Sequence, residues 1–485
     1  MAFVSNNGYL DNPTFRGMRG SLLRSFDKIY IVNLHGSANK KETTPDGGKD
    51  ENIFEIMQGV ALFIGVKKTK KPTWAKVYYA DVWGTREVKL DTLARGNISF
   101  SELKMDPKMA YFIPFGSSDK EAYESGISVA DLFPINVTGI VSGNDGAAIA
   151  PTKAELTRRM DIVKNAVGEK DIFDLWGRYS RGQTAEKIQN DVLSDGKVTP
   201  IAFRPFDNRW TYYSGNSCGW VLWPREKSTM GHLLADPTSP IGPNIGLVFC
   251  KTSRSFFSPF VSKSIIAHRL FSAMCEITYI APLYLRSESE MEGETWTANI
   301  DAAIYDKLTQ HMAEKPDPID VFDYVYGILH DPAYCEKYKE YLCKDFPRVP
   351  VINDPSHDGD ADAFFVSEDM YHAYVSAGQR LRKLHLLQSK APAELTLDPN
   401  TPDDMEIGAA KYKNGVLQLN PNKKIIGISQ DVWEYQIGGH QVLDKWLKEH
   451  KGEMLTIDNF THLENMVGLL SETIQIREDL KNLHA

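Results

Sequence analysis

Two apolar segments on either side of a long polar loop constrain the fold of this chain most. "KIYIVNLHG", from Lys28, and "GVALFIGV", from Gly59, are near-continuous apolar runs, the pattern of central β-strands covered on both faces. "GSANKKETTPDGGKDEN" between them is polar and rich in turn formers, so we expect an ordered or semi-ordered loop at the sheet edge where strands end. "AKVYYADVW" adds another strand. These features predict an α/β fold.

The first residues predict a strand followed by a helix. Ala2, Phe3 and Val4 have the character of a buried strand end and lead into the turn "SNNG". "PTFRGMRGSLLRSF" follows Asn12 and places Pro13 at the first helical position. Helical periodicity then brings four apolar side chains onto one face: Phe15, Met18, Leu22 and Phe26.

The pattern of predicted elements changes from about Val137. Short strand-like pieces with many aromatic residues follow, including "FRPFDNRWTYYSG", "NIGLVFCKT" and "CEITYIAPLYLR". Helical periodicity then covers residues 301–346, with breaks at its prolines. Two more helices are expected, one from about Glu368 to Leu387 and one over residues 459–480. The pattern predicts an irregular α+β domain with helical carboxy-terminal parts.

Composition and motifs exclude several classes of protein. The longest apolar run, residues 53–66, contains Glu55 and Gln58 and is too short to span a bilayer, and no leader pattern occurs, so we expect a cytoplasmic protein. The five cysteines are scattered, which argues against a disulfide framework or zinc ribbon. No G-x-x-x-x-G-K-[ST], G-x-G-x-x-G, G-x-S-x-G or H-E-x-x-H occurs. Residues 358–369 resemble a calcium loop, but Ala363 replaces the required glycine. We therefore predict no metal site.

Positive charge is concentrated in one segment of an acidic chain. The formal net charge is -9, yet residues 197–286 carry ten Lys or Arg against four acids, so this segment is +6 and the remainder -15. A local basic patch suits a polyanion, because phosphate attraction acts over about a Debye length. The alternative is ordinary fluctuation of charge along the sequence.

Several long segments resemble one enzyme family. "FDKIYIVNLHGSANKKETTPDGGKDENIFEIMQGVALFIGVKK" resembles the last strands of the catalytic domain in adenine-specific DNA methyltransferases fused to restriction enzymes, the type ISP and related single-chain systems. "IAFRPFDNRWTYYSG", "RSFFSPFVSKSIIAHRLF", "YIAPLYL", "VFDYVYGILHDPAYCEKYKEYLCKDFPRVP" and "VWEYQIGGHQVLDKWL" resemble the carboxy-terminal specificity domain of those enzymes. The resemblance covers essentially the whole chain.

The resemblance implies a partial methyltransferase. In that family an amino-terminal half carries a glycine-containing motif for S-adenosylmethionine and an N-P-P-Y loop for the target adenine, and this chain has neither. It therefore predicts a partial, Rossmann-like methyltransferase sheet over residues 1–95, a connector over 96–136 and a target-recognition domain over 137–485. No catalytic or cofactor-binding residue is expected here; a complete enzyme would use S-adenosylmethionine. The first strand would then be a cut edge of the sheet, with exposed apolar residues.

DNA-binding candidates come from the basic segment. Phosphates are contacted mainly by Lys and Arg, and arginine on guanine is the most common specific base contact. The best candidates are Arg204 and Arg209 in "FRPFDNRW", Arg225 and Lys227 in "PREKS", and Lys251 and Arg254 in "CKTSR". For each arginine an ion pair within the domain or an aromatic stack is an open alternative; Arg204, for example, could pair with Asp207.

The polar loop supplies further candidates by resemblance. "DENIFEIMQG" corresponds to the late core motif that helps form the pocket for the flipped adenine, and Phe54 could stack on that base. The alternative is core packing of Phe54 under the sheet. Lys40, Lys41 and Lys49 could contact the DNA backbone or be merely solvated.

These observations lead to one main functional prediction and two alternatives. The main prediction is the DNA sequence-recognition portion of an adenine-specific DNA methyltransferase or restriction-modification enzyme, which binds double-stranded DNA, positions the target adenine and is inactive alone. The first alternative is a non-catalytic DNA-binding subunit that completes a methyltransferase on a separate chain. The second is an unrelated hydrolase.

Overall fold

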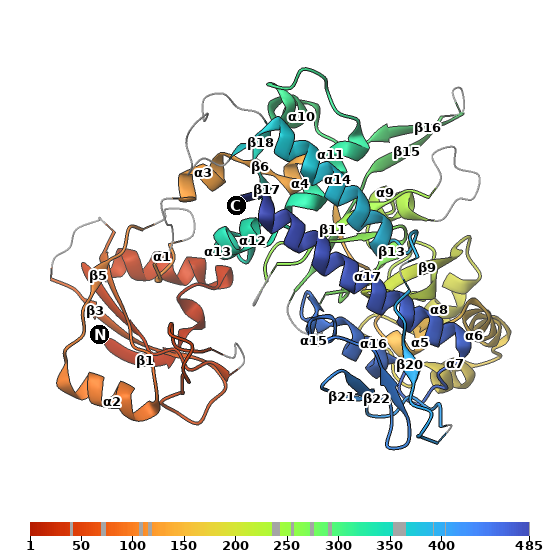
Figure 1. Cartoon of the computed structure of the whole chain (residues 1–485), viewed down its shortest axis with the longest axis horizontal. Helices are drawn as coiled ribbons and strands as arrows, with labels where there is room; N and C mark the ends of the chain where they lie inside the picture. Colours follow the sequence, from red (N-terminus) through yellow and green to blue (C-terminus); the bar gives the residue numbers. More distant parts are fainter. Residues whose placement is uncertain are drawn as a thin grey trace. The chain divides into compact units, whose positions relative to one another are not determined.

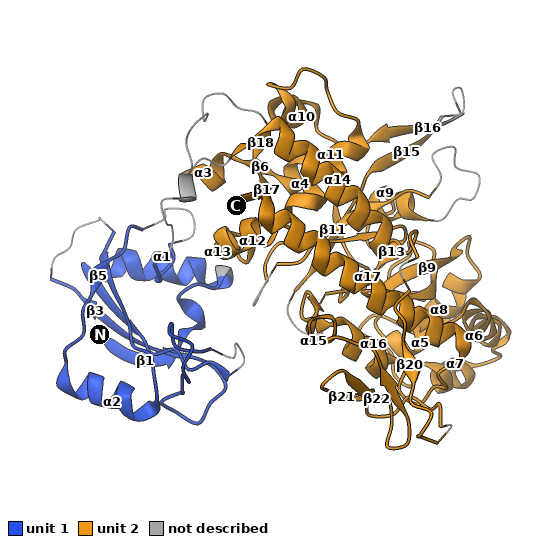
Figure 2. Ribbon diagram, viewed as in Figure 1, with its two compact units in different colours: residues 1–120 blue, residues 121–485 orange. Residues whose placement is uncertain are grey.

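The computed structural model of the chain divides into two compact units. Unit 1 comprises Met1–Lys120 and unit 2 comprises Glu121–Ala485, as the two colours of Figure 2 show. The structure describes residues 1–38, 42–68, 74–105, 110–114, 119–234, 243–253, 257–271, 276–289, 293–352, 365–390, 392–402 and 404–484.

Unit 1 is built around a five-stranded mixed sheet. Its strands lie in the order β1-β3-β2-β4-β5; β2 and β4 are parallel and the other neighbours are antiparallel. The four strands predicted from the sequence are present. The strands are β1 (Ala2–Asn6), β2 (Lys28–Asn33), β3 (Val60–Val66), β4 (Lys76–Asp81) and β5 (Ser101–Glu102).

Each face of this sheet has its own core. On one face Leu23 of helix α1 (Arg16–Ser25) is buried in a cluster with Ile31, Phe63 and Val77. On the other face Val32 and Val60 are buried, with Leu93 of helix α2 (Arg86–Arg95) packed against them. Because residues alternate between faces along each strand, the apolar runs of β2 and β3 supply both cores.

The predicted apolar face of α1 is only partly used. Leu22 and Phe26 pack against the core, but Phe15 and Met18 are each 41% exposed. Arg19 is fully buried instead, where its guanidinium donates to the backbone oxygens of Tyr9, Asn12 and Ala110. Helical periodicity located the helix but not its buried face, because a buried arginine satisfied by carbonyls gives no apolar signal.

Strand β1 is the outermost strand of the sheet. Within the described residues it pairs only with β3, in the register Val4↔Leu62. Val4 is 50% exposed and Ile64 on the neighbouring strand is 41% exposed. Apolar side chains therefore lie exposed at this edge, as the resemblance implied, whereas Ala2 and Val4 are not the buried strand end that their residue types suggested.

Two four-stranded sheets and a hairpin form the first half of unit 2 (Figure 1). Their orders are β13-β9-β10-β8 and β12-β11-β14-β7. The quoted aromatic segments form β9–β10, β11 and β14–β15, as predicted. The strands are β7 (Val137–Thr138), β8 (Ile149–Ala150), β9 (Lys197–Arg204), β10 (Asp207–Tyr213), β11 (Gly246–Cys250), β12 (Phe260–Ser262), β13 (Ile265–Ile266), β14 (Thr278–Pro282), β15 (Tyr284–Ser289) and β16 (Gly293–Ala298).

Short helices surround these sheets. The sequence analysis did not predict the helical region of residues 153–192. The helices are α3 (Asp119–Ser125), α4 (Val129–Leu132), α5 (Asp145–Ala148), α6 (Lys153–Asn165), α7 (Glu169–Trp176), α8 (Ala185–Val192) and α9 (Lys227–Met230).

The helical layer of unit 2 follows the predicted boundaries. Helix α14 (Glu368–His385) has Ser367 as its N-cap, and α17 (Ile457–Lys481) is the long carboxy-terminal helix. Gly378 allows α14 to approach α11 closely, because a Cβ there would collide with the backbone carbonyl of Asp323. Proline starts two of the remaining helices, which are α10 (Ala302–Thr309), α11 (Pro318–Ile328), α12 (Pro332–Lys337) and α13 (Lys339–Leu342).

The last part of unit 2 contains a small sheet that the sequence analysis did not predict. It has the order β20-β23-β22-β21, and short helices follow it.

None of the described helices has the length and apolarity needed to cross a membrane. The remaining elements are β6 (Ile127–Ser128), β17 (Arg348–Val349), β18 (Val351–Ile352), β19 (Phe365–Val366), β20 (Thr396–Leu397), β21 (Lys411–Lys413), β22 (Val416–Gln418), β23 (Lys424–Ile426), α15 (Gln430–Glu434), β24 (Gln436–Ile437), β25 (His440–Gln441) and α16 (Val442–Glu449).

Candidate nucleic-acid interface

The β9–β10 hairpin carries the first two DNA-binding candidates. Arg204 ends β9 and Arg209 lies in β10, and the two-residue connection places Phe206 at a φ of 61°. The pairing register shifts between Asp207 and Asn208, so the hairpin contains a bulge next to its turn. Bulges of this kind re-aim side chains. Both arginines thus start from a tightly defined piece of backbone.

Both hairpin arginines are engaged inside the protein. Arg204 is 8% exposed, and its guanidinium lies 3.4 Å from Glu449, 3.8 Å from Asp145 and over the ring of Phe203. Burial lowers the pKa of Arg204, while the charge of Glu449 opposes this effect. The pair of Arg204 with Asp207, which the sequence left open as an alternative, does not occur among the ion pairs of the described residues.

Arg209 makes that pair instead. Its guanidinium donates to both Asp207 oxygens at 3.0 and 3.1 Å and also lies over Phe203. Guanidiniums that are paired with carboxylates and stacked on a ring hold a fold together, so these two arginines anchor the hairpin to α16 and to its own turn.

Arg225 and Lys227 follow a strained turn. Arg225 has a φ of 68°, is partly buried, and donates from Nε to the carbonyl of Gly139 at 3.1 Å. Its guanidinium lies 5.7 Å from the ring of Trp223, which is 50% exposed. Lys227 is exposed and has no ion-pair partner among the described residues. Lys227 is therefore the more available of these two cations.

Lys251 lies at the end of β11 and remains accessible. Its side chain is 51% exposed, and it lies 3.8 Å from Asp345, itself 59% exposed, and 5.1 Å from the ring of Phe346. A surface ion pair of this length contributes little and exchanges readily with an external anion. Arg254 lies outside the described residues.

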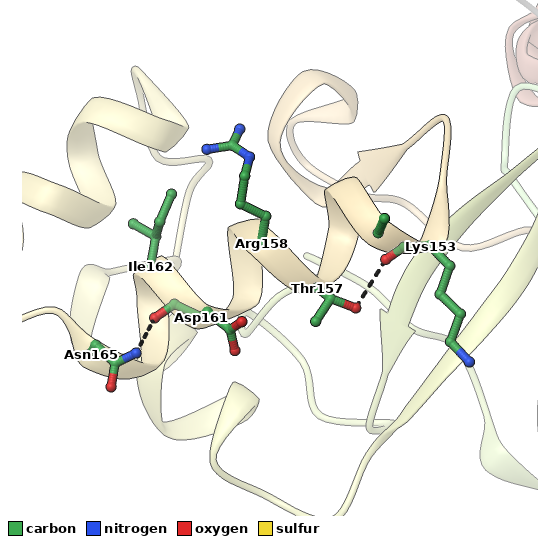
Figure 3. A pocket seen from close by; sticks show the side chains of 7 residues that line it. Lys153, Thr157, Arg158, Asp161, Ile162 and Asn165 are labelled. Carbon is green, nitrogen blue, oxygen red and sulfur yellow. Dashed lines mark hydrogen bonds between the residues drawn. The ribbon is translucent and has the colours of Figure 1, made fainter.

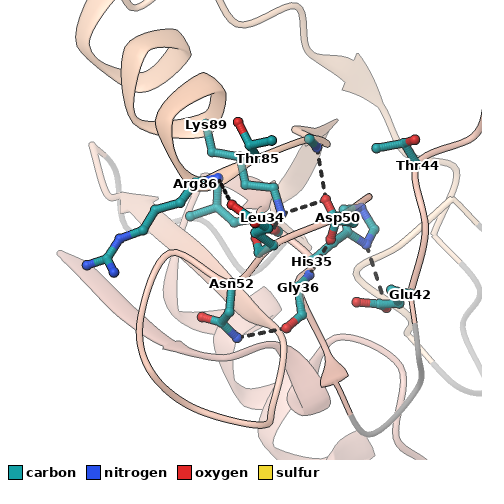
Figure 4. A network of polar contacts seen from close by, with 12 residues as sticks. Leu34, His35, Gly36, Glu42, Thr44, Asp50, Asn52, Thr85, Arg86 and Lys89 are labelled. Carbon is teal, nitrogen blue, oxygen red and sulfur yellow. Dashed lines mark hydrogen bonds and ion pairs between the residues drawn. The ribbon is translucent and has the colours of Figure 1, made fainter. Parts of the chain in front are cut away.

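In unit 1, a buried polar network holds the loop between β2 and β3. Lys89 and Asp50 form an ion pair at 2.7 Å with both side chains fully buried (Figure 4). Lys89 also donates to the carbonyls of Leu34 and Glu51, while Asp50 accepts from the amides of Gly36 and Gly84. A buried pair is tolerable only when its remaining hydrogen-bonding capacity is satisfied, as here. The stretches of this loop around Gly36 and Asp50 are therefore held in place.

His35 extends the same network. Its Nε2 lies 2.6 Å from Asp81, its Nδ1 lies 3.8 Å from Glu42, and its ring stacks on Trp83. Burial alone would lower the pKa of His35, but hydrogen bonding and attraction to Asp81 and Glu42 outweigh it, so the pKa is raised.

The tip of this loop exposes three apolar side chains. Phe54 is 48% exposed, Ile56 44% and Met57 55%, so Phe54 does not pack under the sheet. Lys49 is 78% exposed at the side chain and pairs with Glu51 at 2.6 Å. Lys40 and Lys41 lie outside the described residues. Phe54 is thus accessible for stacking.

An open pocket of about 960 Å³ runs along one face of α6 (Figure 3). All the side chains that line it come from this single helix, and Arg158 among them is held by Glu155. Thr157 and Asn165 donate to carbonyls of their own helix. Because the lining lies on one helix, its polar groups do not converge from opposite walls as they do in most ligand sites. Its lining is Lys153, Ala154, Thr157, Arg158, Asp161, Ile162 and Asn165.

Sequence analysis missed two kinds of residue. The partners of Arg204, Asp145 and Glu449, are distant in the sequence and had no signal there. The lysines of the β20–β23 sheet were also missed, although "KYKNGVLQ" has the Asn-Gly signature of a hairpin turn. Among the described residues, no group of three or more His, Cys, Asp or Glu is arranged to hold a metal ion.

Comparison with solved structures identifies the fold. The chain superposes on the ATP-dependent Type ISP restriction-modification enzyme LlaBIII bound to DNA, with a TM-score of 0.72 and 19% identity over 100% of this chain and 32% of that one. It also matches a DrdV–DNA complex, with a TM-score of 0.70 and 21% identity over 99% of this chain and 50% of that one.

A third match is a nuclease-deletion mutant of the Type ISP restriction-modification enzyme LlaGI in complex with a DNA substrate mimic. Its TM-score is 0.67 and its identity 18%, over 99% of this chain and 39% of that one. The chain therefore spans half or less of the length of these three proteins. Comparison with curated proteins gave no match.

A family model gives the decisive match. The model of the Type ISP C-terminal specificity domain aligns with residues 131–479, which include the hairpins, the helical layer and the small carboxy-terminal sheet of unit 2. Because this match covers most of the chain, the protein belongs to the family of Type ISP C-terminal specificity domains.

Proposed function

We propose that this chain is the DNA sequence-recognition portion of an adenine-specific DNA methyltransferase or restriction-modification enzyme. The observation that carries the proposal is the family match over residues 131–479. Three proteins of the same fold are described in complex with DNA or a DNA mimic, which supports double-stranded DNA as the ligand. In this proposal the chain binds DNA and orients it, and the chemical step belongs to residues outside it.

Unit 1 is, in this proposal, the end of a methyltransferase core. Strand β3 is antiparallel to both neighbours, β1 and β2, and α1 and α2 lie on opposite faces of the sheet. The exposed Val4 and Ile64 at β1 are suited to contact further apolar structure. We keep the division into a core over residues 1–95, a connector over 96–136 and a recognition domain over 137–485 as part of the proposal.

The proposed contacts follow from accessibility. Lys227 and Lys251 are exposed cations of the basic segment and serve as phosphate contacts, and Arg225 joins them from its partly buried position. Arg204 and Arg209 act as positioning residues, because their guanidiniums are already bound to Glu449, Asp145 and Asp207. Arg254, Lys40 and Lys41 stay candidates on sequence grounds.

Phe54 is the proposed stacking residue for the flipped adenine. The loop that carries it is fixed by the Lys89–Asp50 pair, so its exposed ring needs little ordering on binding. Lys49 lies in the same loop and can exchange Glu51 for a phosphate. Such a ring suits base flipping, because the extruded base loses its stacking neighbours and is held between aromatic or apolar side chains.

S-adenosylmethionine does not fit the residues of this chain. In the described part of unit 1, the polar groups at the carboxyl end of β2 bind one another: His35 binds Asp81, and Asp50 binds Lys89, Gly36 and Gly84. The sequence contains neither the glycine motif nor N-P-P-Y. We therefore derive no step through this cofactor and assign it to the complete enzyme.

A titration of the full chain with labelled duplex DNA at several salt concentrations tests the proposal. We expect the chain to bind the duplex. The logarithm of the association constant should fall linearly with the logarithm of salt concentration, because phosphate contacts release counterions. Absence of binding, or affinity that does not respond to salt, would contradict the proposal.

The alternative is a DNA-binding subunit that completes a methyltransferase made on a separate chain. The exposed apolar edge at β1 favours it, since such a subunit needs a docking surface. Mixing this chain with a polypeptide that carries the cofactor motif and N-P-P-Y should restore methyl transfer; no restoration would eliminate this alternative.

A further inference from the structure

The small sheet of β20–β23 has one solvent-facing side on which lysines line up across the strands. Lys411 pairs with Gln418, and Gln418 pairs with Lys424, so these three residues form one cross-strand row. Directly opposed residues point to the same face of a sheet. The next row contains Lys413, Val416, Ile426 and Thr396, and it lies on this face too, because it is two residues further along each strand.

The three lysines on this face are exposed and have no acidic partner. Lys411, Lys413 and Lys424 are all exposed, and no ion pair joins them to any described residue. Some exposed lysines elsewhere in unit 2 are held by carboxylates: Lys448 lies 2.6 Å from Asp444, for example. The strand residues of the two rows include no acidic and no aromatic side chain; Asp398, whose amide donates to the carbonyl of Lys424, lies just beyond the end of β20. No ion pair joins Asp398 to the three lysines among the described residues, so the face is mainly cationic, and we call it the lysine face.

The opposite side of the sheet makes the lysine face rigid. Leu417 and Ile425 alternate with the exposed positions and are fully buried. Tyr412 stacks on Trp433 with ring centroids 4.8 Å apart, and its hydroxyl donates to the carbonyl of Ile428. Lysines on a fixed backbone lose less freedom on binding than lysines in a loop.

Protection of a sheet edge explains only part of this arrangement. Lysines on an edge strand prevent pairing with other chains, and Lys411 and Lys413 lie on the edge strand β21. Lys424, however, lies on β23, which is an interior strand between β20 and β22. Lys424 is the first residue of this strand, and edge protection does not account for a lysine there. Its position points to a ligand that reaches across the strands.

We propose that the lysine face binds the phosphate backbone of double-stranded DNA. This inference rests on the proposed function and names a surface for it outside the basic segment of residues 197–286. Lys411 and Lys424 are two strands apart, about 10 Å, with neutral Gln418 between them, so the charges meet separate phosphates without strong mutual repulsion. Without aromatic side chains the face cannot stack unpaired bases, which favours a duplex backbone over a single strand.

The test is the salt dependence of DNA binding by the full chain with Lys411→Gln, Lys413→Gln and Lys424→Gln combined. The probe is a labelled DNA duplex of mixed sequence. We expect the slope of log K against log salt to shrink by about 0.9 for each lysine that contacts a phosphate, with a uniform loss of affinity for unrelated duplexes. Circular dichroism and thermal unfolding should be unchanged, because all three side chains are exposed.

A matched control separates local contacts from total charge. Lys315→Gln, Lys339→Gln and Lys448→Gln remove the same charge from exposed lysines that are paired with Asp306, Glu336 and Asp444. This control should keep the slope of the unmodified chain. If the lysine-face variant binds the duplex with an unchanged slope, the inference is overturned while the proposed function stands.

Two further outcomes would also decide the matter. If the unmodified chain does not bind the duplex at all, the proposed function fails, and the inference fails with it. If the lysine-face variant loses binding to single-stranded RNA or to an acidic peptide but not to duplex DNA, the lysine face serves a different partner and the inference is overturned.

Discussion

Two antiparallel β elements of unit 2 carry cations, and they use them in opposite ways. In the β9–β10 hairpin, Arg204 and Arg209 are bound to carboxylates and stacked on one ring, and Arg204 is nearly inaccessible. On the lysine face, Lys411 and Lys424 project without a partner among the described residues. The positive segment of the sequence contains the first pair, whereas the second lies outside it. Local charge in a sequence therefore does not tell which cations are free to meet a ligand.

Among the cations that are paired with carboxylates, Lys89 is fully buried together with its partner Asp50. Lys89→Met should lower the free energy of unfolding of unit 1 by about 3–5 kcal/mol, because it leaves a fully buried carboxylate without its counter-charge. Denaturant unfolding measures this loss. The control is Arg95→Gln, which removes an exposed pair with Asp91 and should cost less than about 0.5 kcal/mol. Equal losses in the two variants would mean that burial does not distinguish them.

Arg204→Met should have the next largest effect on stability. We expect a loss of about 2–3 kcal/mol, below the full cost of a broken buried pair, because Asp145 is half exposed and can regain water. The salt slope of DNA binding should stay unchanged when measured at a temperature where the variant is folded. An unchanged stability combined with a reduced salt slope would contradict the positioning role of Arg204 and indicate that it contacts DNA.

His35 is a cation paired with carboxylates only when it is protonated, so its contribution to stability depends on pH. Its pKa is raised in the folded state, so its stabilising contribution is complete below about pH 6.5 and is lost as the pH rises through the raised value. Thermal unfolding of the chain and of His35→Asn should therefore differ more at about pH 6 than at about pH 8. A difference that is independent of pH would contradict the ionic role of His35.

Two buried histidines of unit 2 have pKa values shifted in the opposite direction to that of His35. Burial lowers the pKa of His330 to about 3 and that of His385 well below its ordinary value. The unfolded chain then binds more protons, so this part of the stability falls as the pH drops from about 6.5 toward 3. His330→Asn should accordingly reduce the loss of stability at acidic pH.

Lys227→Gln and Lys251→Gln should have the smallest effect on stability and a visible effect on binding. Both side chains are exposed, and Lys251 has only a long surface ion pair. Thermal unfolding should stay the same, while each substitution should reduce the salt slope by about 1 if the lysine contacts a phosphate. An unchanged slope in both variants would remove these two lysines from the proposed DNA contacts.

The sequence was sufficient for much of the fold because its signals were local. The apolar runs gave β2 and β3, Ser367 marked the start of α14, and Pro332 marked the start of α12. The small sheet containing β21 was missed, because its strands are only two or three residues long and too short to show a period.

The candidate site was less predictable, because availability is a tertiary property. An ion pair within the domain was a correct alternative for Arg204. Its partner could not be predicted, because Glu449 belongs to α16, far along the chain. The alternative of an ion pair within the domain was correct for Arg209 and Asp207, which are neighbours in one strand. Phe54 is exposed on a loop in which Asp50 is paired with Lys89, and no sequence pattern links those two residues.

The salt slope of duplex binding, compared between two charge-removing variants of the full chain, tests the central claim most directly. One variant is Arg209→Gln, which removes a partnered cation, and the other is the combined substitution of Lys411, Lys413 and Lys424 by Gln. The account predicts an unchanged slope for the first and a slope smaller by about 0.9 per contacting lysine for the second. The reverse result, a slope reduced by Arg209→Gln and unaffected by loss of the lysines, would contradict it.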